Sequence, residues 1–493
     1  MPLDPRHPVI AGAAQYVQRV DDPHDALDPL GMMERALRAA ADDAGAPDLL
    51  AAVDKIYLPR GTWRYGDPGK VLADRIGADN PRTSIGIISG HIVQIMIDRA
   101  CQEIADGKHD VIAIVGGESE YSKRKLRKLD PDALWEESDA GEPHENLGSY
   151  GSQPILTSER NAGALIPSAT FALCETSLRH ARGEAPGEHR RRIAEISARL
   201  SSVATGNPSA WIQRPVDAEE IRVESAQNRM VNYPYTKLMT SNIAVDQSAA
   251  LILCSTQAAQ RFGIPDDKRV YLREAVEMNH VAYLSAREKL HDHPGMTMAA
   301  QRLLEISEVD AGDLSQIELY SCFPFAVQAS AAALGIDETR PLTVTGGLTF
   351  SGGPFGSYVV HAMARMVELL RETPGEVGLV GSVGGTFQKF AYATYSTEPG
   401  ATTTPRIENV SEDFARLPER AWQENYQGQA VTESYTVHAE ASGPTRATFA
   451  CLTDTGERVW ASSEDPELLA AILRDEEFCG LPATIAEGRL TLL

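Results

Sequence analysis

Apolar and polar positions along the chain form blocks that are typical of an α/β protein. In the clearest block, residues 84–122, two short apolar runs at 85–88 and 111–115 flank residues 92–106, a segment long enough for a helix and apolar on most faces. This pattern predicts a strand, a tight turn, a buried helix and a second strand, with the two strands parallel inside a covered sheet. The turn Ser89-Gly90-His91 would lie at the helix start, where backbone N–H groups and the helix dipole converge.

The second half of the chain repeats this pattern. Residues 342–347 (LTVTGG) predict a strand, Gly352-Gly353-Pro354 a turn, residues 358–371 a helix, and residues 377–380 a strand that runs on to the paired glycines Gly384-Gly385. The two halves therefore look like structural duplicates.

The rest of the pattern predicts further strands and helices of the two halves, a helical insertion and a small C-terminal unit. Further strands are predicted at residues 7–14, 54–58, 248–254, 269–275 and 316–319, and further helices at 29–44 and 296–306. Beyond a linker, strands at 429–439, 445–453 and 458–462, a helix at 466–473 and one or two strands in 483–492 have the order of an OB-type barrel. The expected units are 1–122 plus 240–268 (N-terminal half), 123–239 (helical loop domain), 269–399 (C-terminal half) and 406–493 (OB-like β-barrel).

The composition limits the classes of partner that we expect this chain to bind. The 493 residues carry a formal net charge of −23, which disfavours nucleic acid and anionic membranes. Residues 406–493 hold 16 acidic residues against 7 arginines and no lysine, so a docking or structural module is favoured over a nucleic-acid-binding barrel. We expect a cytoplasmic protein, because no signal peptide or membrane span is recognisable.

The six cysteines are scattered without a CxxC pair, which predicts reduced and mostly buried thiols and neither a disulfide framework nor a metal site. Two basic clusters stand out in this acidic chain, residues 123–128 (KRKLRK) and residues 189–192 (HRRR). They are either solvated helix surface or cations that hold a phosphorylated ligand.

Several segments, in their order along the chain, resemble the thiolase family over roughly residues 8–397. These segments are GGES at 116–119, Tyr233-Pro234-Tyr235, VDQSAA at 245–250, GGPFG at 352–356 and GSVGGT at 381–386. The resemblance is nearest to thiolase-like and sterol-carrier-type thiolase proteins. It implies an α/β class, the duplicated thiolase fold (βαβαβαββ twice, layered α/β/α/β/α), a role in lipid metabolism, and CoA or acyl-CoA as the ligand, with no covalently bound cofactor.

The four thiolase active-site motifs can be placed on this sequence. The nucleophile motif Cys-x-Ser falls on Gly90-His91-Ile92, or places its cysteine at Ile87 in an alternative alignment; Asn-Glu-Ala-Phe falls on Cys322-Phe323-Pro324-Phe325, Gly-His-Pro on Gly352-Gly353-Pro354, and Cys-x-Gly on Ser382-Val383-Gly384. Gly90, Gly353 and Ser382 thus replace cysteine, histidine and cysteine. Acyl transfer from a thioester needs an activated thiolate, a base and an oxyanion hole. We therefore expect an acyl-CoA-binding protein without ordinary thiolase activity.

The main alternative is an active acetyl-CoA or acyl-CoA acyltransferase with a rearranged site. In that reading Cys322 is the nucleophile and His91 and His361 are the bases, although a free cysteine is commonly an inert core residue. Ser89 is a weaker candidate, because a serine nucleophile needs an adjacent base.

Ligand-binding residues can be proposed as well. The resemblance makes the turn glycines Gly352, Gly353, Gly384 and Gly385 candidates to cradle a thioester carbonyl through backbone N–H groups, and Arg190 and Arg191 candidates to bind the phosphates. A third reading is a scaffold whose C-terminal domain docks a protein partner. Thiolases commonly form dimers through the edge of the core sheet, and an appended barrel could block that surface, so the oligomeric state stays open.

Overall fold

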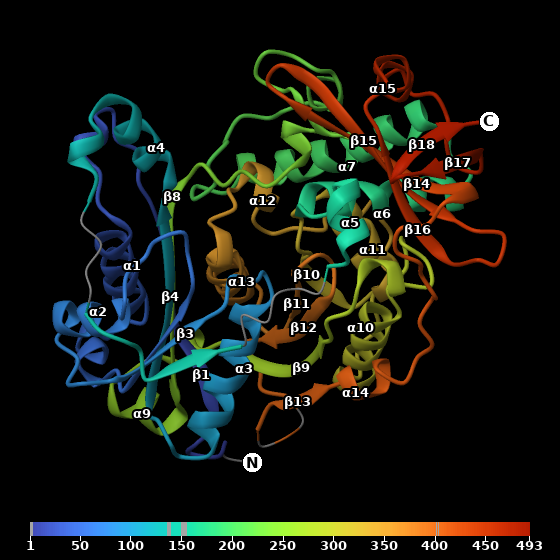
Figure 1. The fold of residues 1–493 in the computed structure, drawn as a ribbon. Coiled ribbons are helices and arrows are strands. Elements are labelled where there is room, and N and C mark those ends of the chain that lie inside the picture. The colour runs from blue at the N-terminus through green and yellow to red at the C-terminus, as the bar shows by residue number, and fades with distance from the viewer. Residues whose placement is uncertain (1–2, 136–139, 149–154, 401, 403) are drawn as a thin grey trace.

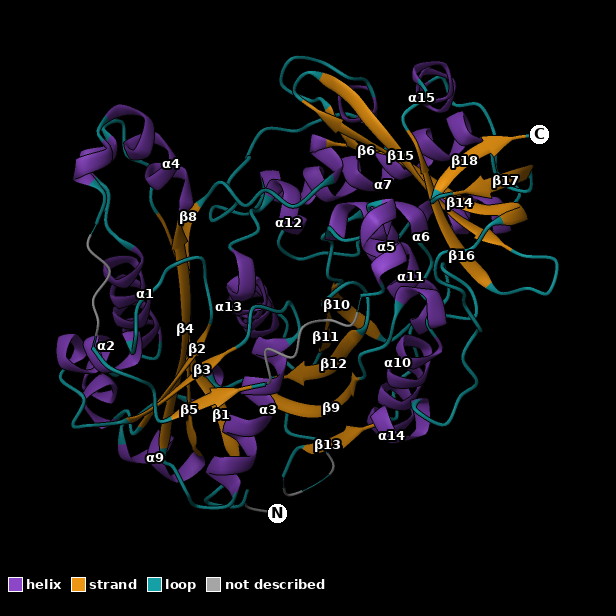
Figure 2. Ribbon diagram, in the orientation of Figure 1, coloured by secondary structure: helices purple, strands orange, loops and turns teal. Residues whose placement is uncertain are grey.

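The computed structural model describes residues 3–135, 140–148, 155–400, 402 and 404–493 (Figure 1). Two sheets with helices between and outside them form the body of the molecule, and a third sheet belongs to the C-terminal domain (Figure 2). None of the described helices is long and apolar enough to cross a membrane.

The first sheet has the strand order β1-β8-β4-β2-β3-β5. Its strands are β1 (Pro8–Val17), β2 (Lys55–Pro59), β3 (Arg82–Gly86), β4 (Val111–Ser119), β5 (Glu145–Leu147) and β8 (Asp246–Ser255). The predicted strand-helix-strand unit is present as β3, α3 (Ile92–Ala105) and β4. However, β3 and β4 are not neighbours, because β2 lies between them and runs parallel to both. The short strand β5 pairs in parallel with β3 and covers the edge of the sheet.

The second sheet has the order β10-β11-β12-β9-β13. Its strands are β9 (Tyr271–Asn279), β10 (Leu314–Glu318), β11 (Val377–Gly384), β12 (Lys389–Ser396) and β13 (Arg406–Asn409). The helices α3 and α13 (Tyr358–Glu372) pack between the two sheets. The helices α1 (Pro29–Asp43), α2 (Pro68–Ile76) and α9 (Thr256–Arg261) cover the outer face of the first sheet, and α10 (Pro294–Ser307) and α11 (Pro324–Leu334) that of the second. The result is the expected α/β/α/β/α layering.

The prediction of a strand at residues 342–347 is wrong. Leu319 N donates to Leu342 O, but the next residues turn toward a side chain: the backbone N–H groups of Val344 and Thr345 donate to Glu318 at 2.9 and 3.1 Å. Gly346 then adopts a left-handed φ of 104° and begins the short helix α12 (Gly347–Phe350). A buried carboxylate thus satisfies the amides that a neighbouring strand would otherwise bind.

The insertion between the halves is mostly helical, as expected. It contains α4 (Glu120–Leu129), α5 (Thr157–Ala162), α6 (Pro167–Ala181), α7 (Pro186–Thr205) and α8 (Ala218–Arg222), with short strands β6 (Met230–Asn232) and β7 (Tyr235–Thr236).

The C-terminal strands close into a ring. They are β14 (Gly428–Glu440), β15 (Gly443–Leu452), β16 (Arg458–Ser463), β17 (Pro482–Ala486) and β18 (Arg489–Leu492), and the helices of this part are α14 (Ser411–Phe414) and α15 (Pro466–Leu473). Each strand pairs with the next in the order β14-β15-β16-β18-β17, and β17 pairs back with β14; β16 and β18 are parallel. The insertion joins this domain, because β6 pairs with β14 and Tyr233 packs in the same core as Tyr435.

Candidate functional site

A cavity of about 430 Å³ lies where the turn before α3 meets the insertion and the loops of the second half. We call it the central cavity. It is lined from the first half by Ile88, Ser89 and Gly90, from the insertion and the loop before β8 by Pro167, Ser168, Val231, Thr240, Ser241 and Ile243, and from the second half by Tyr320, Cys322, Phe323, Leu348, Gly353, Phe355 and Gly356. None of these side chains carries a charge.

Three of the four mapped motif positions, Gly90, Cys322 and Gly353, line this cavity together. The fourth, Ser382, is buried in β11, and its hydroxyl donates to Ala391 O at 3.1 Å. The other turn glycines do not line the central cavity within the described part of the chain. Gly352 faces the side chain of Gln247, and Gly384 packs against Ser89 and His91.

The space next to Gly90 is already filled. A β-carbon at this position would lie 2.2 Å from Val383 O and 2.4 Å from both Cζ and Oη of Tyr320. Glycine is therefore required here by the close approach of a backbone carbonyl and a phenol ring. The phenol of Tyr320 takes the space in which a nucleophilic side chain at residue 90 would begin.

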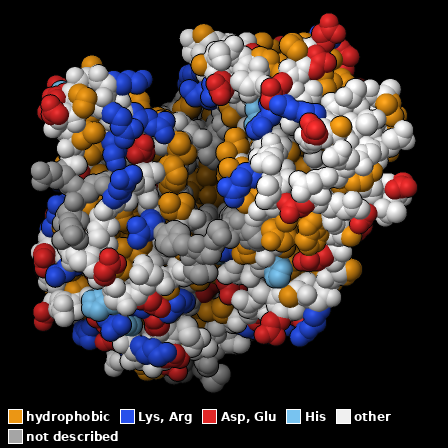
Figure 3. All heavy atoms as spheres, in the orientation of Figure 1, with side chains coloured by type: hydrophobic (Ala, Val, Ile, Leu, Met, Phe, Trp, Pro, Cys, Tyr) orange, Lys and Arg blue, Asp and Glu red, His pale blue; other side chains and the backbone are white. Residues whose placement is uncertain are grey.

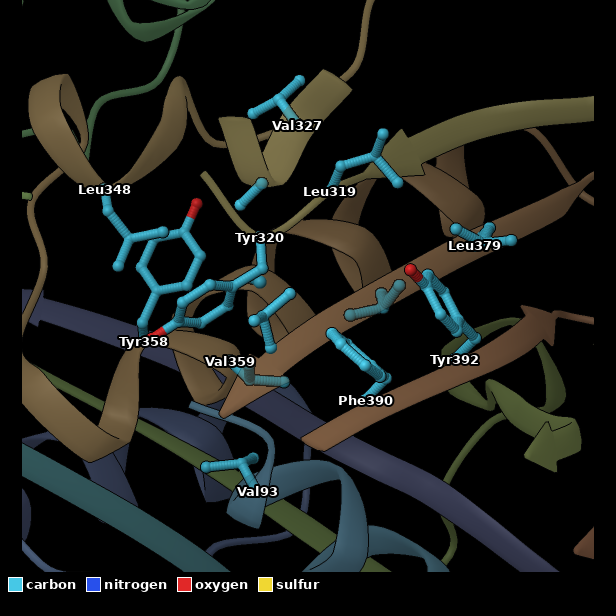
Figure 4. Packing of buried hydrophobic residues seen from close by; sticks show 14 of the residues in the cluster. Val93, Leu319, Tyr320, Val327, Leu348, Tyr358, Val359, Leu379, Phe390 and Tyr392 are labelled. Atoms are coloured by element: carbon cyan, nitrogen blue, oxygen red, sulfur yellow. The ribbon is translucent and has the colours of Figure 1, made fainter. Parts of the chain in front are cut away.

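A buried network holds Tyr320 in this position. Its ring packs edge-on against Tyr358 at a centroid distance of 5.6 Å (Figure 4). Tyr358 Oη donates to the buried carboxylate of Glu318 at 2.6 Å, and Thr343 Oγ1 donates to the same group at 2.8 Å. Burial raises the pKa of Tyr320, so its phenol stays protonated. Sequence reasoning missed Tyr320, although it lies two residues before Cys322, the first residue placed on the Asn-Glu-Ala-Phe motif.

Cys322 faces the central cavity but is not activated. Burial raises the pKa of its thiol to about 12, although backbone N–H groups of Phe323 and Cys322 act in the opposite direction. All six cysteines are free, and Cys322 is the one that is partly exposed, which confirms the prediction of mostly buried thiols.

The structure does not bring the two proposed histidine bases to Cys322. His91 is buried, and its Nδ1 lies 2.8 Å from Ser89 Oγ. His361 is also buried, with its Nδ1 3.1 Å from Gln15 Oε1. Burial lowers the pKa of each imidazole to about 3. Neither lines the central cavity among the residues that the structure describes.

The proposed phosphate-binding arginines also lie elsewhere. Arg190 is buried between α7 and the C-terminal domain, where it pairs with Asp475 at 3.1 Å and its guanidinium lies 5.7 Å from the ring centre of Tyr233. Arg191 is exposed on α7. The phosphate site was predicted from the run of basic residues at 189–192. Such a run does not distinguish cations that form ion pairs within the fold from cations that bind a ligand.

One cluster has donor atoms of the types that bind metal ions. Side-chain atoms of His180, Glu477 and Cys479 lie within 4.8 Å of one another. Arg179, however, donates to both carboxylate oxygens of Glu477 and lies 3.5 Å from Cys479 Sγ. A cation therefore already neutralises this carboxylate.

Comparison with known proteins gives a family-model match in the C-terminal part of the chain and a similarity to an acetyl-CoA acetyltransferase. Residues 409–488 match the family model described as the thiolase-like protein type 1 additional C-terminal domain. An acetyl-CoA acetyltransferase of Methanothermobacter thermautotrophicus is 25% identical over 224 residues, which span 41% of this chain and 56% of that protein.

Solved structures extend the likeness to the whole chain. A monomeric SCP2-thiolase-like protein type 1 from Mycobacterium smegmatis is 27% identical, with a TM-score of 0.83 over 100% of both chains. The dimeric peroxisomal thiolase of Saccharomyces cerevisiae is 15% identical, with a TM-score of 0.56 over 80% of this chain and 98% of that one. The second likeness shows the fold alone, and it agrees with the α/β layering described above.

Proposed function

Because the chain is a member of the thiolase superfamily with an extra C-terminal domain, we propose that it binds CoA or an acyl-CoA thioester in the central cavity without ordinary thiolase activity. The observation that carries this proposal is the contact between Gly90 and Tyr320. With a phenol and the Val383 carbonyl against residue 90, a thiolate has no room at the start of α3. The covalent acyl-enzyme route of a thiolase needs that thiolate.

The character of the cavity supports an acyl thioester as the ligand. Ile88 and Ile243 line it and remain 49% and 36% exposed, and Leu165 and Ile166, just before the lining residue Pro167, are 48% and 46% exposed. Exposed apolar side chains around a concave site are typical of a surface that buries an apolar ligand. Figure 3 shows the molecule hollowed between the part that carries α4 and the part that carries α12, with hydrophobic side chains on both walls.

Two measurements test the proposal. Titration calorimetry with CoA and with a series of acyl-CoA thioesters is expected to give binding that strengthens with acyl length. Thiolysis of acetoacetyl-CoA by the same preparation is expected to stay at the background rate. Absence of any binding at millimolar ligand would refute the binding function, and robust thiolysis would refute the loss of thiolase chemistry.

The second candidate is an acyl-CoA acyltransferase that uses Cys322. It is favoured by one observation, that Cys322 lines the same cavity as Gly90. It requires a base that deprotonates a thiol of raised pKa, and the described residues around the cavity offer none. Comparing acyl-CoA turnover by the wild type and Cys322→Ala decides between the two: equal background rates exclude this candidate.

Further proposals concern the fold of the C-terminal domain, the oligomeric state and the location of the protein. We propose that residues 406–493 form an OB-type barrel, which the closed ring and the parallel β16–β18 pair support.

We propose that the protein is a monomer, because β5 covers the free edge of β3 and the M. smegmatis relative is described as monomeric. Light scattering on the purified chain tests this. A cytoplasmic location, the four-unit division of the chain and a protein partner for the C-terminal domain also remain proposals.

A further inference from the structure

The helix α4 presents a cationic surface at the carboxyl end of β4. Tyr121, Lys125 and Lys128 follow one another at helical spacing, so they share a face, while Ser122 and Leu126 are buried on another. Lys125 Nζ lies 4.4 Å from the ring centre of Tyr121. Neither Lys125 nor Lys128 forms an ion pair with any carboxylate in the described ranges. In a chain of net charge −23, such cations are conspicuous.

The side chain of Tyr121 links α4 to the segment that carries Trp211. The rings of Tyr121 and Trp211 pack edge to face with centroids 5.1 Å apart. Arg19 reaches Trp211 as well: its guanidinium lies 5.0 Å from the indole centre and donates to Ala210 O at 2.7 Å and Trp211 O at 3.1 Å. We call Arg19, Tyr121, Lys125, Lys128 and Trp211 the α4 platform.

The α4 platform is connected to the central cavity through backbone hydrogen bonds. Trp211 N donates to Ser351 O at 2.9 Å, and Ile212 N donates to Phe350 O at 2.8 Å. Ser351 lies two residues before Gly353, which lines the cavity. The segment that carries Trp211 is therefore held directly against the segment that leads into the wall of the central cavity.

Two of the three arginines in the other basic cluster are used within the fold. Arg190 pairs with Asp475, and Arg192 pairs with Glu184 and Glu338. A phosphate there would compete with carboxylates that already bind these guanidinium groups. On the α4 platform, by contrast, a phosphate would meet cations without a carboxylate partner, which is the arrangement that gives strong charge-assisted hydrogen bonds.

We propose that the α4 platform binds the phosphate groups of CoA while the thioester end occupies the central cavity. This inference rests on the proposed CoA-binding function and assigns the phosphorylated end of the ligand to α4. Arg19 beside Trp211 and Lys125 beside Tyr121 hold the anionic groups, and Lys128 extends the cationic surface by one helical turn.

The test separates the two ends of the ligand. The affinities of free CoA and of a phosphate-free acyl-pantetheine thioester are measured for the wild type, Lys125→Ala/Lys128→Ala and Lys70→Ala. Lys70 is the matched control, an exposed helical cation on α2, outside the α4 platform. Loss of two charge-assisted contacts is expected to weaken CoA by about tenfold or more. Acyl-pantetheine affinity should not change, and Lys70→Ala should leave both affinities unchanged.

Each other outcome has a distinct meaning. If the wild type binds CoA and the double variant binds it equally well, the α4 assignment is overturned while the proposed function stands. If the variant weakens CoA and acyl-pantetheine to the same extent, the effect is not on the phosphates and the assignment is again overturned. If the wild type binds neither probe, the proposed function itself fails, and the inference fails with it.

Discussion

The hydroxyl oxygen of Tyr320 lies 2.4 Å from the point at which a β-carbon on residue 90 would stand, although the two residues come from opposite halves of the chain. This contact explains why restoring the missing thiol should not restore a thiolase. Gly90→Cys forces the new side chain against both the phenol and Val383 O, and overpacking of this kind costs about 1–3 kcal/mol. We expect a lower melting temperature and no acetoacetyl-CoA thiolysis.

The matched control for this variant is Gly312→Cys, because an added β-carbon there meets nothing within 4 Å. It should melt close to the wild type. A Gly90→Cys variant that is as stable as this control would contradict the packing argument.

The thiol of Cys322 should react slowly with alkylating reagents. Its pKa of about 12 means that little thiolate is present at neutral pH, so iodoacetamide labelling should accelerate about tenfold per pH unit between pH 7 and 10. Mass spectrometry after peptide digestion locates the modified residue, with Cys322→Ala as the control. Rapid labelling at pH 7 would instead indicate an activated nucleophile. Bound acyl-CoA should protect the site.

The buried imidazole of His361 should make the native state sensitive to acid. Its pKa of about 3 lies below the usual value of about 6.5, so the unfolded chain takes up a proton first as the pH falls. The stability contributed by the neutral imidazole is present above about pH 6.5 and is lost as the pH falls toward 3. Between pH 7 and 5 the loss is about 2 kcal/mol.

Denaturant unfolding at several pH values checks this expectation. The dependence should be shallower in His361→Gln, whereas His180→Gln, a change at an exposed position on α6, should behave as the wild type. Parallel curves for His361→Gln and the wild type would show that this imidazole is not held neutral.

The pair of Arg190 and Asp475 should contribute to stability and not to ligand affinity. Among the residues that the structure describes, Arg190→Ala leaves the carboxylate of Asp475 with the hydroxyl of Tyr233 alone, which donates to it at 2.9 Å. Because Asp475 is 22% exposed, we expect a cost of about 2 kcal/mol, below the ~3–5 kcal/mol of a fully buried pair. Calorimetric unfolding measures it, with Arg191→Ala as the control. A large fall in CoA affinity with unchanged stability would instead indicate that Arg190 contributes to ligand binding.

Most of the architecture could be predicted from local patterns. The unit of β3, α3 and β4, the helices α1, α10 and α15, and the strands of the C-terminal domain follow from periodicity and turn residues. The prediction failed at residues 342–347, where the side chain of Glu318 replaces a neighbouring strand as the acceptor of backbone hydrogen bonds. It was incomplete for the first sheet, because the order of strands depends on pairing between distant segments.

The sequence by itself determined the thiolase-type frame and the absence of cysteine or histidine at Gly90, Gly353 and Ser382, because those statements depend on residue identity and order along the chain. Only the tertiary structure decided what fills the space beside Gly90, where Arg190 finds its partner, and that Trp211 links α4 to the loop before Gly353. Each of these is a contact between residues far apart in sequence. Such contacts are set by the packing of the whole chain, which no local pattern encodes.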